Sequence, residues 1–321
     1  DGHADADAIT RLGALGCEVL AGPETASLPP WLRAHGRELA AVMLCRHTVA
    51  GQYAALVRRH APQARLIFDT VDLHFLREGR AAELSGSAAM RRQAEHSRRS
   101  ELALIDAADL SFVVSPHEKA LLAELLPAAR VALLSNIHDI HGCRRPHAGR
   151  RDLVFVGGAG HPPNLDAMRW IAGAILPALR ARLPDRQVHI IGSVPEALRA
   201  ELAAPGLVFH GRIPDLTPWM DSCLAALAPL RFGAGVKGKI NMAMSHGLPV
   251  IATTLAVEGM CLEHERDVLV ADDPAACVAA VERLRTDAAL WARLSAAGLD
   301  NVREHFSAAA AARALAAALP A

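Results

Sequence analysis

The sequence predicts an α/β protein with two doubly wound, Rossmann-like domains that face each other across a cleft. Short apolar runs alternate with amphipathic helical stretches along the chain, which is typical of parallel sheets covered by helices on both faces. A polar, arginine-rich break at residues 141–151 interrupts this alternation and indicates a linker. The length of 321 residues is sufficient for two hydrophobic cores.

The order of the expected elements follows from this alternation. In the first half, strands are expected at residues 18–21, 41–45, 65–69, 110–114 and 131–134. In the second half they are expected at residues 153–156, 188–191, 207–209, 224–228, 250–252 and 268–270. Helices are expected between them, for example at residues 51–60, 118–126, 164–183 and 275–284.

These elements divide the chain into an N-terminal domain (residues 1–145), a C-terminal domain (146–305) and a terminal helix (306–321) capped by Ser307. The terminal helix is expected to pack back on the first domain. The chain opens without a methionine, as a segment cut from a larger protein would, and the first domain is expected to be incomplete.

Composition excludes several classes of function. The formal net charge is zero, so nucleic acid is not an expected partner. No apolar stretch approaches the ~20 residues that span a bilayer. The six cysteines show no CxxC spacing and are expected to be reduced, mostly buried thiols. These features favour a cytoplasmic protein. Four arginine pairs, at residues 91–92, 98–99, 144–145 and 150–151, are expected to be solvated, with weak contact to an acidic inner membrane as the alternative.

The most informative loop, residues 233–239 (GAGVKGK), follows the strand at 224–228. Of 34 basic residues only three are lysines, and two of them, Lys237 and Lys239, lie in this loop. Glycines allow close backbone approach, and a following helix would offer free amides, so Gly235, Val236 and both lysines are expected to bind a diphosphate. The loop matches part of a Walker motif, but Ile240 replaces the magnesium-binding hydroxyl residue. An exposed glycine turn is the structural alternative.

Other strand ends supply further candidates for a nucleotide-phosphate site. The glycine-rich turn after residue 156 contains Gly157, Gly158 and His161, which could line the phosphates, whereas Asn164 could cap the next helix. After residue 209, Arg212 and Ile213 could approach a nucleobase, although this segment could equally be a turn before a short helix at Asp215 or Thr217.

In the first domain, Asp72 and His74 follow the strand at residues 65–69 and are expected to face the cleft, although Asp72 could instead cap the next helix. His47, Asn136 and His138 also follow strands and are weaker candidates. The histidines show no HxxxH or HExxH spacing, so no metal site is expected.

Taken together, these segments resemble retaining glycosyltransferases of the GT-B fold, specifically the large bacterial family 4 group. The resemblance is carried by FVGGAGHPPNLDAM (155–168), GRIPDLTPWM (211–220), APLRFGAGVKGKINMAMSHGLPVIAT (228–253) and LVADDPAACVAAV (269–281). A looser similarity covers IFDTVDLHFLRE (67–78) and VVSPHEKALL (113–122).

The resemblance implies metal-independent hexosyl transfer, with retention, from a nucleotide sugar bound by the second domain to a glycan or lipid-linked acceptor at the first. No cofactor beyond the donor substrate is implied. His74 and Asp72 are then expected to be catalytic on the acceptor side. The expected product is a surface polysaccharide, lipid-linked glycan or glycolipid.

Two departures from the family pattern affect the expected donor site. Met242 stands where family members usually carry a ribose-binding glutamate, and Ala234 stands at a companion acidic position. The turn at residues 157–164 also lacks the usual arginine and lysine, so Arg231, Lys237 or Lys239 must supply cationic charge. Two alternatives therefore stay open, a degenerate nucleotide-sugar-binding or assembly domain and a GT-B sugar-nucleotide epimerase.

Overall fold

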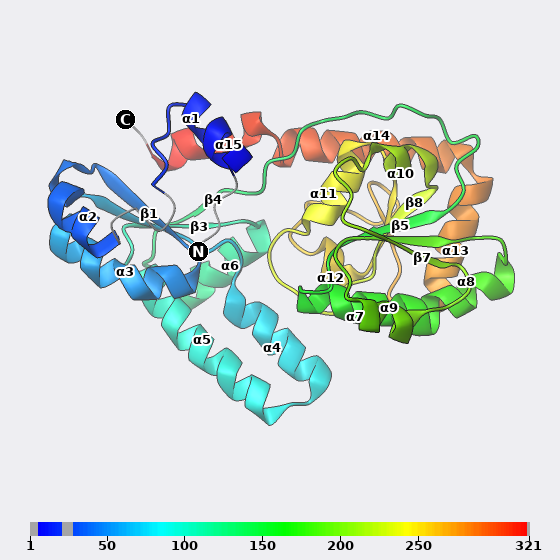
Figure 1. Cartoon of the computed structure of the whole chain (residues 1–321), viewed down its shortest axis with the longest axis horizontal. Coiled ribbons are helices and arrows are strands. Elements are labelled where there is room, and N and C mark those ends of the chain that lie inside the picture. The colour runs from blue at the N-terminus through cyan, green and yellow to red at the C-terminus, as the bar shows by residue number, and fades with distance from the viewer. Residues whose placement is uncertain (1–5, 21–27, 320–321) are drawn as a thin grey trace.

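A computed structural model describes residues 6–20 and 28–319. The chain forms two parallel sheets, each in its own layered α/β domain, and the domains lie side by side (Figure 1). The predicted α/β class is confirmed. The second sheet is doubly wound, because the order of its strands reverses within the sheet. In the first sheet the described strands lie side by side in the order of the sequence.

The first sheet contains β1 (Ala41–Cys45), β2 (Arg65–Asp69), β3 (Leu110–Val113) and β4 (Val131–Leu133) in sequential order. Leu66 and Phe68 pack against α3 and α6, whereas Ile67, on the opposite face, packs with the C-terminal helix. Its helices are α1 (Ala6–Ala14), α2 (Leu28–His35), a 3₁₀ turn (Gly36–Glu38), α3 (His47–His60), α4 (His74–Ser85), α5 (Ala88–Ala107) and α6 (Pro116–Leu125).

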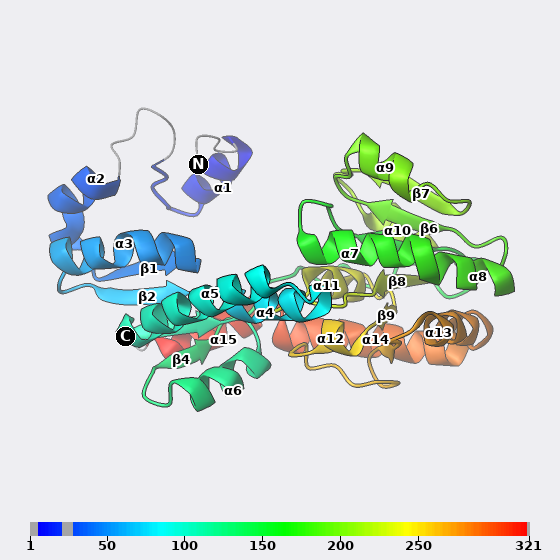
Figure 2. The ribbon, with the colours of Figure 1, turned by 90° about the horizontal axis from the view of Figure 1, so that it is seen from below.

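Helices α4 and α5 form an antiparallel hairpin that projects from the first sheet (Figures 1 and 2). The base of this hairpin carries the cleft residues that follow β2. The first turn of α4 has no cap from its own flanking side chains. Instead, the buried Glu101 of α5 accepts hydrogen bonds from the His74 and Phe75 backbone amides, at 3.2 and 3.1 Å. Asp72 therefore does not cap this helix, and its carboxylate is available to other partners.

The C-terminal helix α15 (Ala308–Ala318) lies on the face of the first sheet opposite α3 (Figure 1). As predicted, the Ser307 hydroxyl caps it by accepting from the Ala310 amide. Ala318 packs with Ile67 and Phe112, and its carbonyl accepts from the Arg65 guanidinium at 3.3 Å. The end of the chain thus completes the core of the first domain.

The prediction of a strand at residues 18–21 is wrong for residues 18–20, which the structure describes. Residues 17–20 have no regular secondary structure, and Ala21 lies outside the described residues. Leu20 is 51% exposed. A strand requires a neighbour for its backbone hydrogen bonds, and β1, the edge strand, pairs only with β2 in the described part of the chain.

The second sheet contains β5 (Leu153–Val156), β6 (Val188–Ile191), β7 (Leu207–Gly211), β8 (Ala225–Ala228), β9 (Val250–Ala252) and β10 (Leu269–Val270), in the order β10-β9-β8-β5-β6-β7. The strand order reverses between β5 and β8, where ligands bind in doubly wound folds. The helices of this domain are α7 (Pro162–Trp170), a π-helical turn (Ile171–Ile175), α8 (Leu176–Arg182), α9 (Glu196–Leu202), α10 (Thr217–Ser222), α11 (Gly238–Ser245), α12 (Thr254–Val257), α13 (Pro274–Thr286) and α14 (Ala288–His305).

Arg150, in the linker, is buried. The prediction that the arginine pair at residues 150–151 is solvated is therefore wrong for Arg150. Its guanidinium donates to the Met220 and Cys223 carbonyls at 2.7 and 2.9 Å and lies 4.6 Å from the centre of the Trp291 ring. These contacts compensate the desolvated charge and attach the linker to the second domain.

The six cysteines are free, as expected, but three of them (Cys17, Cys45 and Cys143) are exposed rather than buried. Within residues 6–20 and 28–319, no helix combines the length and the apolar character that crossing a membrane requires.

Candidate functional site

The loop between β8 and α11 reaches across to the first domain. Arg80 of α4 donates to the Gly233 carbonyl at 2.8 Å and to Glu258 at 2.9 Å. Gly235 has a φ of +66°, and a Cβ atom there would lie 2.9 Å from the Cβ of Asp72. A side chain at this position would therefore separate the two domains, which explains the glycine.

Lys237 is 6% exposed, and its ammonium donates to the Gly235 carbonyl at 2.9 Å and the Glu258 carbonyl at 3.4 Å. Burial lowers its pKa to about 8, with the nearby Glu258 charge opposing the shift. Within the described residues it forms no ion pair within 4 Å. A buried ammonium held by carbonyls alone is a site for an incoming anion.

Lys239 lies in the first turn of α11, and its ammonium contacts the Asn164 side-chain oxygen and lies 4.4 Å from the centre of the Phe155 ring. Burial lowers its pKa to about 7, and no carboxylate contributes to that shift. The helix N-terminus adds partial positive charge at the same place. The geometry therefore brings two poorly compensated lysines and the N-terminus of α11 to the switch point of the second sheet.

The glycine turn after β5 lies against the turn after β6. Gly157, Gly158, Arg212 and Ile213 line one pocket of about 330 Å³, together with Gly192. The structure thus brings these four predicted residues together at the carboxyl ends of β5, β6 and β7. The expected short helix also forms, as α10, with Asp215 accepting from the Thr217 amide at 2.9 Å.

A second pocket, of about 500 Å³, lies between the domains. From the predicted set it contains Asp72, His161, Val236 and the weaker candidate Asn136. Burial, with the nearby positive charges of Arg77 and Lys239, lowers the pKa of His161. His138 lies outside this lining, although its ring is 3.9 Å from where a Gly238 Cβ would stand.

Asp72 lines this pocket, whereas His74 is buried beside Asp72 and is not among the lining residues. The His74 Nδ1 atom is 3.4 Å from the Asp72 carboxylate and 3.5 Å from Glu101. Arg77, for which the sequence carries no signal, contacts the Asp72 carboxylate directly. Burial lowers the pKa of His74, but hydrogen bonding to Glu101 and the Asp72 charge outweigh it, so the net shift is upward.

Three other predicted residues have partners that the sequence did not indicate. Asn164 does not cap α7; its side chain donates to the Gly158 carbonyl at 3.0 Å and holds Lys239. Arg231 forms an ion pair with Asp166, which raises its pKa, and lies outside both pockets. Met242 is half-buried and packs against the second core.

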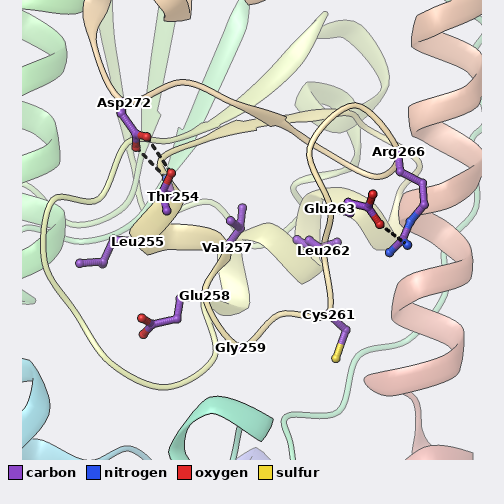
Figure 3. A pocket seen from close by; sticks show the side chains of 10 residues that line it. All are labelled: Thr254, Leu255, Val257, Glu258, Gly259, Cys261, Leu262, Glu263, Arg266 and Asp272. Carbon is purple, nitrogen blue, oxygen red and sulfur yellow. Dashed lines mark hydrogen bonds and ion pairs between the residues drawn. The ribbon is translucent and has the colours of Figure 1, made fainter.

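An open groove of about 960 Å³ follows β9 and is lined by residues including Thr254, Glu258, Glu263, Arg266 and Asp272 (Figure 3). Its charged groups already have partners, Glu258 with Arg80 of α4 and the others with one another. Thr254 bonds to Asp272 twice at 2.7 Å, and Arg266 pairs with Glu263 at 2.6 Å (Figure 3). This groove offers less uncompensated charge than the lysine loop, so the candidate phosphate site is the loop.

Residues 150–287 match the family described as Glycosyl transferases group 1. A Klebsiella pneumoniae relative, an uncharacterized 44.6 kDa protein in the cps region, is 27% identical over 144 residues. That alignment covers 42% of this chain and only 35% of the relative's length.

Solved structures similar to this chain include HepE from Anabaena in complex with UDP-glucose, at 14% identity and a TM-score of 0.73, covering 98% of this chain and 89% of that one. Sucrose-phosphate synthase from Thermosynechococcus elongatus has 20% identity and a TM-score of 0.70, with coverage of 92% and 80%. TarM has 9% identity and a TM-score of 0.72, with coverage of 91% and 57%. These likenesses show the predicted GT-B fold.

Proposed function

We propose that the chain transfers a sugar from a nucleotide-sugar donor to a glycan or lipid-linked acceptor, because residues 150–287 match the family of group 1 glycosyltransferases. The donor diphosphate binds to Lys237, Lys239 and the amides at the start of α11. The sugar then lies in the interdomain pocket, and the nucleobase lies in the pocket of Gly157, Gly158, Arg212 and Ile213. We further propose hexosyl transfer with retention of configuration.

The observation that carries this proposal is the pair of lysines in the loop after β8. Desolvation makes each ammonium costly in the free protein, which lowers both pKa values. A diphosphate removes that cost, and the charge that develops as it departs is stabilised by the same groups. These two cations perform the role that a metal ion has in other transferases, so no metal at the diphosphate is part of the proposal.

In the proposed reaction, the acceptor hydroxyl attacks the anomeric carbon on the face from which the diphosphate departs. The bond to the departing phosphate oxygen breaks, and the hydroxyl proton passes to that oxygen. No nucleophile of the protein is required. Asp72 lines this pocket from the first domain, with the His74 Nδ1 atom 3.4 Å from its carboxylate, and we assign to this pair the orientation of the reacting sugar or acceptor.

Incubation with a panel of nucleotide sugars and hydroxyl acceptors tests the function. We expect one donor to raise the melting temperature, since it binds only the folded state, and to yield a glycosylated acceptor. An epimerase would instead yield an altered nucleotide sugar without an acceptor. A degenerate binding domain would show binding but no turnover unless Met242→Glu restores it. Turnover in the unaltered protein would exclude the degenerate alternative.

Donor binding should take up protons. In the free protein, burial lowers the pKa of Lys239 from 10.5 to about 7, and a bound diphosphate favours the charged form and raises it again. Between about pH 7 and 10, binding is therefore coupled to proton uptake, and affinity falls as the pH rises. Calorimetry in buffers of different ionisation enthalpy measures this uptake. Zero uptake at pH 8 would contradict the assignment.

The same shift affects stability with the opposite sign. The native state binds fewer protons at Lys239 than the unfolded state between its lowered pKa and 10.5. The contribution of this group to the free energy of unfolding therefore increases with pH across that window. As the pH rises through this window, donor affinity therefore falls and the free energy of unfolding increases.

A further inference from the structure

Three potential metal ligands meet beside the interdomain cleft, although they lie far apart in the sequence. His47 is the first residue of α3, His74 is the first residue of α4, and Glu101 lies in α5. One ligand atom from each lies within 4.8 Å of the others, and the two imidazole rings meet edge to face with centroids 4.3 Å apart. The end of β1, the end of β2 and the helical hairpin thus converge on one point.

The protein uses these side chains only in part: His74 Nδ1 lies 3.2 Å from the Asp72 carbonyl oxygen, whereas His47 and Glu101 keep unused capacity. The buried Nδ1 atom of His47 has no hydrogen-bond partner in the described residues. Glu101 is fully buried, and its two oxygens accept one backbone amide each from the start of α4. A carboxylate has about four acceptor positions, so coordination capacity remains on both oxygens.

The local charges favour a cation. Within the described part of the chain, Glu101 makes no ion pair with a lysine or arginine; its partner is His74, with 3.5 Å between Oε1 and Nδ1. Asp72 and Glu78 add negative charge nearby. Arg77 opposes it, but its guanidinium binds the Asp72 carboxylate. The buried Glu101 carboxylate therefore lacks a fixed cation, which a bound metal ion would supply.

We propose that His47, His74 and Glu101 bind a divalent transition metal ion, with Zn²⁺ chemistry as the best match. Two imidazoles and one carboxylate are a ligand set that zinc accepts, at about 2.0–2.2 Å. Ligand atoms of a tetrahedral ion at these bond lengths lie about 3.4 Å apart, and the three atoms here lie within 4.8 Å of one another. Three protein ligands leave a fourth position for water or another oxygen ligand. The site is separate from the lysine loop, and it replaces the expectation of no metal.

Titration of the chelator-treated full chain with Co²⁺ tests the site without any assay of transfer. We expect one equivalent of Co²⁺ to produce the visible absorption of a four-coordinate ion, and Zn²⁺ to displace it. His47→Ala should weaken binding by at least about 100-fold, because loss of a ligand exceeds the 10–100-fold effect typical of outer-shell changes. His47 is preferred as the first variant because, unlike Glu101, its side chain accepts no hydrogen bond from a backbone amide in the described residues.

Two further variants keep the test decisive. Glu101→Gln retains the shape of the side chain and should also abolish stoichiometric Co²⁺ absorption; circular dichroism checks its folding. His96→Ala removes an exposed histidine from α5, the helix that carries Glu101, and should bind Co²⁺ as the unaltered chain does. Absence of stoichiometric binding, or equal binding by His47→Ala and His96→Ala, would overturn the proposal. In that case His74 is held by Asp72 and Glu101 alone.

Discussion

Lys239→Met is expected to weaken donor binding about 10–100-fold, the effect of losing one charged hydrogen bond of about 1.5–3 kcal/mol. The turnover number should fall further, by about 100–1,000-fold, because the charge that develops on the leaving diphosphate loses a preorganised donor. Methionine preserves the length of the side chain. Since the ammonium has no carboxylate partner, its removal should raise the melting temperature of the free protein. Calorimetry, steady-state kinetics and thermal unfolding measure the three effects.

The chain contains a matched control for this variant. Lys119, the one lysine outside the loop, is exposed on α6. Lys119→Met removes the same charge and should leave donor affinity and turnover unchanged. Equal donor affinity in the Lys239 and Lys119 variants would rule out the loop as the diphosphate site.

Gly192→Ala is expected to destabilise the protein by about 2–6 kcal/mol, since backbone strain and overpacking each cost about 1–3 kcal/mol. Gly192 has a φ of +149°, and a Cβ atom there would lie 2.3 Å from the Gly157 carbonyl oxygen. Neither backbone can move freely, because the Gly157 amide bonds to Ile191 and the Gly192 amide to Gly211, both at 2.8 Å. Urea unfolding measures the loss, which should be accompanied by loss of nucleotide binding in the adjacent pocket.

Gly160→Ala tests whether this effect belongs to the contact rather than to glycine replacement in general. Gly160 lies in the same turn after β5, and a Cβ atom there meets nothing within 4 Å. Its replacement should leave the free energy of unfolding within about 0.5 kcal/mol of the unaltered value. A similar loss in both variants would show that the close approach of Gly192 and Gly157 is not the cause.

The sequence predicted the strand bounds well where a short run of apolar residues marks the strand. The strands at residues 41–45, 65–69, 153–156, 188–191 and 250–252 have the expected bounds, because buried parallel strands are short apolar runs with helices between them. The strand at residues 18–21 failed for a non-local reason. Its apolar residues are typical of a strand, but a strand also requires a neighbouring strand for its backbone hydrogen bonds. The local sequence does not show whether such a neighbour is present.

The candidate site divides in the same way. Gly157, Gly158, Arg212 and Ile213 follow strands that end at the same edge of the sheet, and they line one pocket. Side chains that arrive from elsewhere were missed or misplaced. Glu101 reaches the cleft only because α5 folds back along α4, and Arg231 turns toward Asp166 of α7. Such partners depend on helix packing, for which the spacing of single residues carries no signal.

The polypeptide passes between the domains twice, once through residues 134–152 and once where α14 is followed by α15. The two passages are joined, because the His138 amide donates to the Phe306 carbonyl at 2.7 Å. Two adjacent connections permit rotation about the axis they define and resist twisting of one domain against the other. The paired connections therefore favour one fixed register of the loop of Lys237 and Lys239 against Asp72.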